Sequence, residues 1–265
     1  MGKKLTRFSE LSREMKAVEK SFEAVIPKDA RIVVRLDGRA FTTLTRKTLG
    51  FTEPFDERFH TWMLATADAL LGCGIPIPFV YTQSDEISLV VSDNGVPFGR
   101  RECKLLTLLS GVASSAFSLA SGVPAAFDAR LIGLRSDKSV GRYFTWRLVD
   151  SERNCLNGYA YWTMRNSGLG GAEIAERLKG MPSREKYALL DEAGVDFRTV
   201  PHWQKRGSSG FFVERMAEGV DGLTGEPTRA LRRSRVFDEE LPAAAEFGDF
   251  VIGKVFGTNG SEEKA

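Results

Sequence analysis

Histidine and cysteine are scarce in this chain. Among 265 residues there are two histidines, His60 and His202, and three cysteines, Cys73, Cys103 and Cys155. The odd number and wide spacing of the cysteines fit neither a disulfide framework nor a cluster of zinc ligands. So few histidines nearly exclude a histidine-rich metal centre, and they leave a Cys/His or Ser/His/Asp catalytic arrangement without support. If the protein binds a metal, oxygen atoms are the expected ligands.

Long apolar runs and a strong charge excess are also lacking. No apolar run reaches about 18 residues, and the start Met1-Gly2-Lys3-Lys4 lacks the apolar stretch of a signal peptide. We therefore expect a cytoplasmic protein with no membrane partner. The net charge of +2 is too small to imply nucleic-acid binding by itself, and 42% apolar residues are ordinary for a soluble globular protein.

Two strand-like segments end in carboxylates. Residues 31–36 are rich in β-branched side chains and break at Asp37-Gly38, which predicts a buried strand with Asp37 at its end. Two further apolar runs, residues 79–82 and 87–91, flank Gln83-Ser84-Asp85-Glu86, which predicts a hairpin with an acidic tip.

Carboxylates that meet raise one another's pKa unless a cation neutralises them, and oxygen ligands select Mg²⁺. With phosphates as further ligands, such a pair becomes a phosphoryl-transfer site. Each segment also has a purely structural interpretation, because Asp-Gly is common in turns and Ser-Asp can cap a helix. The pattern alone leaves both interpretations open.

The order of predicted elements indicates an α+β fold. Apolar spacing predicts helices at 9–24, 55–72 and 101–121, and a strand at 126–134 joins the strand and hairpin described above. After the first helix the order is βαββαβ, the ferredoxin-like arrangement of an antiparallel sheet with helices on one face. We assign residues 1–135 to this domain. The arrangement places the first strand beside the hairpin, which would bring Asp37 close to Asp85.

Beyond residue 135 we expect a mainly helical region over residues 136–256. Helices are predicted at 140–154, 171–179 and 183–192, and loops at 166–171 and 206–210. The Gly207-Ser208-Ser209-Gly210 loop is either a flexible turn or a cradle of backbone N–H groups for an anion. The tail, residues 257–265, is small and charged and is expected to be disordered.

Basic residues fall in three clusters: Arg100, Arg101 and Lys104; Lys205 and Arg206 near Trp203; and the arginines at 229, 232, 233 and 235. Each cluster is either a solvated face or a set of phosphate contacts. Trp203 is either a core residue or free to stack on a base.

Several short segments together resemble the tRNA-His guanylyltransferase family in order and spacing. They are Arg-Leu-Asp-Gly-Arg-Ala-Phe at 35–41, Ser-Asp-Glu at 84–86, Gly-Arg-Arg-Glu-Cys-Lys-Leu at 99–105, Phe-Asp-Ala-Arg at 127–130, and Arg-Glu-Lys at 184–186 with Gly-Ser-Ser at 207–209. The resemblance covers roughly residues 10–215. It implies a palm like that of nucleotide polymerases and class III cyclases. It also implies 3′–5′ nucleotide addition to the 5′ end of tRNA, in which a triphosphate activates that end and the 3′-OH of an incoming nucleotide attacks it.

The resemblance implies site residues position by position. Asp37 and Asp85, with the Gly38 carbonyl, would hold two Mg²⁺ ions, and Glu86 would complete the catalytic carboxylates as a neighbour or outer ligand. The nucleotide would be bound by these two aspartates and Gly38 together with Arg39, Ala40, Phe41, Thr42, Ser84, Arg101 and Lys104. The tRNA phosphates would contact Lys205, Arg206, Arg232 and Arg233. GTP, ATP and other nucleoside triphosphates are the implied substrates, and a homotetramer built as a dimer of dimers is the implied assembly.

The chain departs from the family pattern at three places. Glu152-Arg153-Asn154-Cys155 stands where the guanylyltransferases carry His-Ile-Asn-Asn, after the Arg-x-x-Asp at Arg147 to Asp150. This difference points to the tRNA-guanylyltransferase-like proteins, which resemble 5′-end repair polymerases. The family favours histidine where Thr42 stands and lysine where Glu53 stands, which alters part of the expected phosphate contacts.

Two alternative functions stay open from the sequence. The same palm permits a nucleotidyl cyclase, although the helical second region has no obvious task there. A catalytically silent tRNA-binding protein is the other alternative, with the changes at Thr42, Glu53 and Glu152 marking lost activity. The intact carboxylates favour the 3′–5′ nucleotidyltransferase, whether it repairs tRNA 5′ ends or adds guanylate to histidine tRNA.

Overall fold

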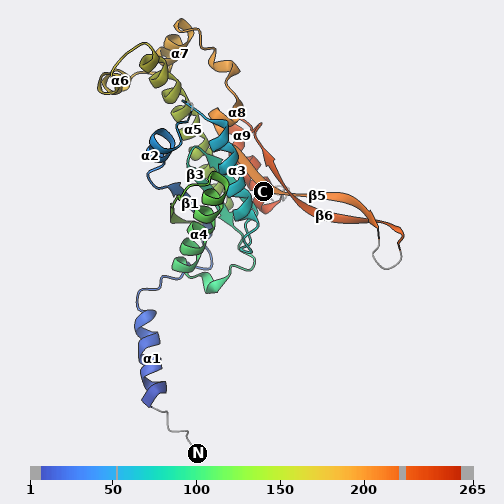
Figure 1. The fold of residues 1–265 in the computed structure, drawn as a ribbon. Coiled ribbons are helices and arrows are strands. Elements are labelled where there is room, and N and C mark those ends of the chain that lie inside the picture. The colour runs from blue at the N-terminus through green and yellow to red at the C-terminus, as the bar shows by residue number, and fades with distance from the viewer. Residues whose placement is uncertain (1–6, 52, 221–224, 258–265) are drawn as a thin grey trace, which may run out of the picture.

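The computed structural model describes residues 7–51, 53–220 and 225–257. A single sheet of six strands, in the order β4-β1-β3-β2-β5-β6, organises the molecule, and every neighbouring pair is antiparallel. Helices cover both faces of this sheet, while α1 (Arg7–Glu19) and the β5–β6 hairpin project from the body in different directions (Figure 1).

The first half of the chain has the predicted βαββαβ order. It comprises β1 (Arg31–Gly38), α3 (Glu57–Leu71), β2 (Phe79–Gln83), β3 (Glu86–Val91), α4 (Glu102–Ser121) and β4 (Phe127–Leu134). The short elements α2 (Phe41–Thr43), η1 (Leu44–Thr48) and η2 (Phe98–Arg100) lie in the connections. The predicted strand, hairpin and helices are confirmed to within a few residues, and so is the adjacency of β1 and β3.

Alternate residues of the central strands enter two separate cores. Ile32, Val34 and Leu36 of β1 are fully buried against α3 and α4, in a cluster that includes Met63 and Phe117. Val33 points to the opposite face, where α5 (Asp137–Asn166) and α9 (Ala244–Phe256) cover the sheet. Because side chains alternate along a strand, a run that is apolar at every position is what a strand covered on both faces requires.

The second half has the predicted helices, with the first one extended to Asp137–Asn166 in α5, and in addition two strands. Helices α6 (Gly171–Leu178) and α7 (Ser183–Glu192) agree with the sequence, and η3 (Phe197–Thr199) and α8 (His202–Arg206) follow them. The strands β5 (Ser208–Val220) and β6 (Pro227–Asp238) were not expected, and β5 pairs with β2. The sheet therefore continues past residue 135. Of the predicted disordered tail, residues 258–265 lie outside the described part of the chain.

The predicted loop at 206–210 is the start of β5. Ser208 pairs with Thr82, and Gly210 with Val80. Gly207 has φ of 72°, and a Cβ there would lie 2.3 Å from the Thr82 carbonyl oxygen. Both interpretations of this segment, a flexible turn and an anion cradle, are therefore wrong. The glycines permit a close approach between two strands, which is their common purpose within a sheet.

Helix α4 is the one helix of the described chain that is long and apolar enough to cross a membrane by length and composition. The sequence analysis predicts no membrane span here, because Glu102, Lys104 and several polar residues interrupt the apolar runs of this helix. Its inner face is built into the core, since Leu105, Leu109 and Phe117 are fully buried. Most other residues of α4 are partly or fully exposed, so only one face of the helix belongs to the core.

The crossing of α5 and α9 depends on two glycines. A Cβ on Gly141 would lie 2.8 Å from the carbonyl oxygen of Gly248, and one on Gly248 would lie 2.9 Å from Oγ1 of Thr145. We expect Gly141→Ala to lower the free energy of unfolding by about 1–3 kcal/mol, because backbone must move to admit the methyl group. Urea unfolding measures this effect.

The control is Gly158→Ala, on the same helix, where the nearest atom would be Cβ of Pro54 at 3.7 Å. Alanine should raise stability there by up to about 1 kcal/mol, because it favours the helix. Equal stability of the two variants would contradict the close crossing of α5 and α9.

Candidate active site

The predicted meeting of Asp37 with the hairpin tip is confirmed. Asp37 lies opposite Glu86 in the β1–β3 ladder, and the backbone N–H of Gly38 donates to the Asp85 carbonyl oxygen over 3.0 Å. Ser84 and Asp85 form the turn between β2 and β3, with Ser84 at φ of 49° and its hydroxyl donating to Asp85 Oδ1. Two segments about fifty residues apart are thus joined at one edge of the sheet.

Burial and the neighbouring Asp37 carboxylate both raise the pKa of Asp85. Such a pair favours a bound cation, which would remove the repulsion. Within the described residues, no group of three or more His, Cys, Asp or Glu side chains is placed to hold a metal. Two carboxylates and the Gly38 carbonyl instead suit Mg²⁺, which is commonly bound by one or two carboxylates, water and substrate phosphates.

Glu86 is engaged in a buried ion pair. Nε and Nη2 of Arg147, on α5, donate to its two carboxylate oxygens over 2.7 and 2.8 Å. Burial raises the pKa of Glu86, although the Arg147 guanidinium opposes the shift. Arg147 also lies 3.2 Å from Asp150. Because both oxygens of Glu86 are occupied, its geometry is that of a residue that positions the start of β3, not that of a metal ligand.

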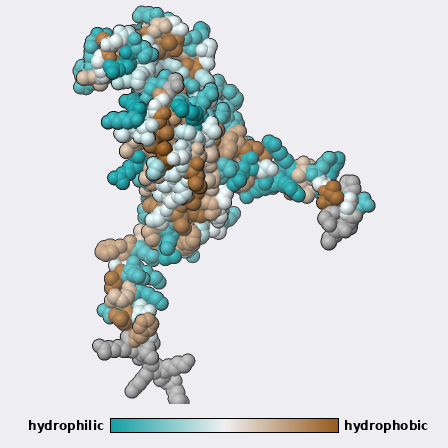
Figure 2. All heavy atoms as spheres, in the orientation of Figure 1, coloured by the Kyte–Doolittle hydropathy of each residue, from teal (hydrophilic) through white to brown (hydrophobic). Residues whose placement is uncertain are grey.

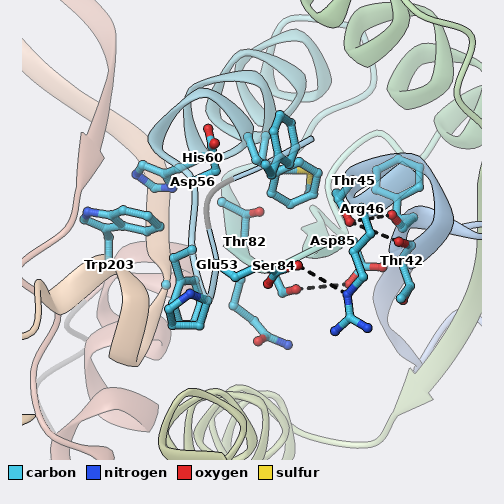
Figure 3. Close-up of a pocket in the computed structure, with 18 residues that line it drawn as sticks. Thr42, Thr45, Arg46, Glu53, Asp56, His60, Thr82, Ser84, Asp85 and Trp203 are labelled. Atoms are coloured by element: carbon cyan, nitrogen blue, oxygen red, sulfur yellow. Dashed lines mark hydrogen bonds and ion pairs between the residues drawn. The ribbon is translucent and has the colours of Figure 1, made fainter. Parts of the chain in front are cut away.

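A cavity of about 180 Å³ opens beside Asp85. Its lining combines aromatic side chains with carboxylates and hydroxyls: Phe41, Thr42, Thr45, Arg46, Phe51, Glu53, Phe55, Asp56, Phe59, His60, Ser84, Asp85 and Trp203. Trp203 and His60 stand on one side and Thr42 and Arg46 on the other, with Ser84 and Asp85 between them (Figure 3). A volume of this order accommodates an aromatic ring.

The segment predicted to bind nucleotide divides between core and cavity. Phe41 is buried against Phe117 and Phe127, with ring centroids 4.9 and 5.0 Å apart, yet it also reaches the cavity wall. A Cβ on Gly38 would overlap the Phe41 ring at 2.5 Å, so the glycine admits this ring. Ala40 is at φ of 59°, and Arg39 is exposed. Phe41, Thr42, Ser84 and Asp85 are therefore the predicted nucleotide residues that line the cavity.

Arg101 and Lys104 do not join this site within one chain. The Arg100 guanidinium donates to the Ala30 carbonyl over 2.7 Å, and Arg101 pairs with Glu23 over 3.0 Å. These contacts fix the start of α4 beside the start of β1, about 20 Å from Asp37 at the rise of a β-strand. The prediction that both grip the triphosphate beside Asp37 is wrong for a single chain, because α4 begins at the opposite end of the sheet.

The four residues predicted to contact tRNA do not form one surface. Arg206 is held by Glu152 over 2.8 Å and by the Leu241 carbonyl, while Lys205 donates to the Arg198 carbonyl. Arg232 and Arg233 lie on β6, in the projecting hairpin (Figure 1). Contact of these four residues with tRNA stays a prediction.

Trp203 is part of the cavity wall. Its ring stacks on His60 with centroids 4.2 Å apart and an interplanar angle of 13°, and Nε2 of His60 lies 2.7 Å from Glu239. Trp203 is half-buried and lines a cavity, so the core interpretation is wrong, whereas stacking of a base on it stays a prediction. The ring is fixed by its neighbours and faces the cavity.

The departures from the family pattern have clear positions. Glu53 pairs with Arg46 over 3.2 Å at the cavity, and Thr42 is exposed beside them. Glu152 is turned toward Arg206, on the α8 side of α5. Burial raises the pKa of the Cys155 thiol to about 12, so this cysteine is a neutral core residue and no nucleophile.

Sequence reasoning missed three features of the site. Asp128 lies opposite Asp37 on β4 and adds a third carboxylate to the same face; its segment was singled out, but only the strand pairing shows the neighbour. Arg147 was visible only as part of an Arg-x-x-Asp spacing. The cavity draws Phe51, Phe55 and Asp56 from the segment before α3; the last two were predicted to begin the helix, which instead starts at Glu57.

The Arg147–Glu86 pair makes a measurable prediction. We expect Arg147→Met to lower the free energy of unfolding by up to about 3–5 kcal/mol at neutral pH, because it leaves the buried Glu86 carboxylate with only the more distant Arg35, 3.7 Å away. The folded-state pKa of Glu86 is raised, so ionised Glu86 opposes folding above that pKa and ceases to do so as the pH falls through it. Part of the loss should therefore return in acid, and adding Glu86→Gln should restore much of it at neutral pH.

Arg153→Met is the matched control, because Arg153 pairs with Asp150 on the same helix but is exposed. That loss should stay below about 1 kcal/mol. Urea unfolding of the three variants at neutral and acid pH decides the matter, and similar losses in Arg147→Met and Arg153→Met would refute the buried pair.

Comparison with known proteins agrees with this geometry. The family profile described as tRNAHis guanylyltransferase matches residues 12–134, and the profile described as Thg1 C terminal domain matches residues 138–240. A probable tRNA(His) guanylyltransferase of Drosophila melanogaster is 31% identical over 202 residues, covering 71% of this chain and 70% of the relative. The tRNA(His) guanylyltransferase of Candida glabrata is 30% identical and is covered to 84%.

Solved structures share the fold. A bacterial tRNA(His) guanylyltransferase (Thg1)-like protein in complex with ATP superposes with a TM-score of 0.71 at 23% identity, covering 93% of this chain and 99% of that one. The tRNA(His) guanylyltransferase of Saccharomyces cerevisiae gives 0.66 at 28% identity, covering 73% and 90%. From the matching profiles and the relatives above 30% identity, the chain belongs to the tRNA(His) guanylyltransferase family of nucleotidyltransferases.

Proposed function

We propose that this protein is a cytoplasmic, Mg²⁺-dependent 3′–5′ nucleotidyltransferase whose reaction centre is the junction of Asp37 with Asp85. Its family membership makes nucleotide addition to the 5′ end of tRNA the reaction. The observation that carries the proposal is the hydrogen bond between Gly38 and Asp85, which holds the end of β1 with Asp37 next to Asp85, a carboxylate in the wall of a ring-sized cavity. A nucleotide whose base occupies this cavity would place its phosphates near Asp85 and Asp37.

Asp37, Asp85 and the Gly38 carbonyl are the groups that would hold two Mg²⁺ ions. Bound there, the ions would lower the pKa of an attacking hydroxyl and neutralise a leaving pyrophosphate. Glu86, held by Arg147, fixes the strand start that carries Asp85. Ser84 keeps the Asp85 carboxylate oriented through its hydroxyl.

The cavity is suited to the base of a nucleoside triphosphate. Its walls supply aromatic faces, including Phe55 and Trp203, on which a base can stack, and Glu53 and Asp56 supply acceptors for base N–H groups. Structures of similar fold are complexes with GTP and with ATP. We propose both nucleotides as ligands here, with other triphosphates as further substrates.

Repair of truncated tRNA 5′ ends is the form of the reaction that we favour over guanylate addition to histidine tRNA. The observation that favours it is Glu152, which stands where the guanylyltransferases carry the first residue of His-Ile-Asn-Asn. Glu152 is committed to an ion pair with Arg206. A carboxylate in this place repels phosphate instead of binding it.

Extension of a 5′-truncated, 5′-triphosphorylated tRNA with labelled triphosphates tests the activity. We expect Mg²⁺-dependent extension by the unaltered protein and a loss of at least about 10³-fold in Asp37→Ala, because the reaction would lose a metal-binding carboxylate. Glu173→Gln, an exposed carboxylate on α6, is the control and should keep full activity. Full activity in Asp37→Ala, or extension without divalent cations, would refute the assignment.

A homotetramer belongs to the same proposal, and α1 (Arg7–Glu19) supports self-association. This helix stands apart from the body (Figure 1), and apolar side chains follow its length (Figure 2). Phe8, Leu11, Met15, Val18 and Phe22 recur at spacings of three and four and are 45–99% exposed. An isolated helix of 13 residues is marginal in water. A second copy of the chain that covers this stripe would stabilise it.

We expect Leu11→Glu with Met15→Glu to lower the molar mass in solution by at least a factor of two, because charges would enter the covered stripe. Light scattering coupled to size exclusion measures it. Lys16→Glu, on the same helix, controls for a change of charge. A monomeric unaltered protein, or an assembly untouched by the double change, would exclude α1 as the contact.

A further inference from the structure

An exposed tryptophan lies beside the reaction centre and has no role in the site described above. Trp146, on α5, is 53% exposed, although a tryptophan normally buries most of its surface. Its ring packs against the Arg147 guanidinium, whose Cζ is 4.6 Å from the ring centroid. Arg147 binds Glu86, and Glu86 lies opposite Asp37. Trp146 is therefore linked to the reaction centre by two direct contacts.

The orientation of this ring is fixed. The Trp146 and Tyr143 rings meet edge to face with centroids 5.8 Å apart, and the Tyr143 hydroxyl lies 3.5 Å from that of Ser88 on β3. With Tyr143 at its edge and Arg147 on one face, the ring is held in place before any ligand arrives. Preorganised aromatic surfaces lose little entropy when a ligand stacks on them.

Exposed arginines lie on β4, at the end of β1 and on α5, the helix that carries the ring. Arg130 lies opposite Arg35 on the edge strand β4, Arg39 follows the end of β1, and Arg142 precedes Trp146 by one helical turn; Arg39, Arg130 and Arg142 are exposed. Of the acidic residues here, Asp150 is paired with Arg147 and Arg153, and Asp128 lies opposite Asp37. A flat aromatic face among arginines suits a base flanked by phosphates.

We propose that Trp146 is the platform on which the terminal base pair of the tRNA acceptor stem stacks, with Arg39 and Arg130 in contact with the phosphates of its 5′ strand. This inference rests on the proposed function and deepens it. The reaction at a 5′ end requires that the end be placed against the metal ligands. An RNA helix ends in an exposed base pair, and an aromatic ring that continues its stack places that end without reading its sequence.

Binding of a 5′-triphosphorylated acceptor-stem minihelix, without nucleotide or Mg²⁺, tests the platform. We expect Trp146→Ala to weaken binding by roughly 5- to 150-fold, the loss of one base stack, and Trp146→Phe to stay within about 3-fold. Val149→Ala, an exposed apolar residue on the same helix, should change nothing. Arg130→Gln should reduce the slope of log affinity against log salt by about one.

Single-turnover extension separates this role from others. In Trp146→Ala the concentration of RNA for half-maximal rate should rise in step with the binding constant, whereas the rate at saturating RNA and the KM for GTP should stay unchanged. Unchanged RNA binding by Trp146→Ala, with the unaltered protein active, would overturn the platform alone.

Absence of both RNA binding and extension in the unaltered protein would overturn the proposed function together with this inference. A fall in molar mass on Trp146→Ala would assign the face to a second copy of the chain and so overturn the platform as well. An unchanged thermal midpoint for Trp146→Ala, expected of an exposed side chain, confirms that the variant is folded.

Discussion

The site depends on one backbone hydrogen bond, from Gly38 N–H to the carbonyl oxygen of Asp85. It joins the end of β1 to the turn between β2 and β3, so the two aspartates cannot separate without loss of strand pairing. Like charges held together in this way oppose folding, and burial adds to the effect, as the raised pKa of Asp85 shows. Burial of the apolar side chains of β1 and β3 offsets this repulsion.

The same constraint explains why Glu86 and Arg147 are buried as a pair. Directly after Asp85, β3 turns the Glu86 side chain toward α5, where an unpaired carboxylate would be strongly unfavourable. Arg147 satisfies both of its oxygens and is itself tied to Asp150. A helix of 30 residues is thereby fixed to the start of β3, and Trp146, the residue directly before Arg147, lies at its surface.

Both halves of the chain contribute residues to the site. The proposed metal ligands come from the first half, on β1 and at the hairpin tip, while Arg147 and Trp203 come from the second half. Because β5 pairs with β2, the cavity wall that carries Trp203 is attached to the hairpin that carries Asp85. The two family profiles meet near residue 135, but the sheet continues across this position.

The sequence predicted those features that depend on residues close together in the chain. Periodic apolar runs at 31–36 and 79–91, interrupted by carboxylates, sufficed to predict the strands, their ferredoxin-like order and the meeting of Asp37 with Asp85. These signals are local, and the short connections leave few ways to pair the strands. The charged strands β5 and β6 carried no such signal, since a projecting hairpin buries little along most of its length.

The tertiary structure alone decided which basic residues share a surface. Arg101 and Lys104 follow the hairpin closely in sequence, yet α4 starts at the end of the sheet remote from Asp37, because each connection reverses the chain. Arg206 is held within the fold and Trp203 lines a cavity, because their neighbours come from segments more than thirty residues away. Contacts between distant segments depend on how the elements pack, and no local pattern encodes them.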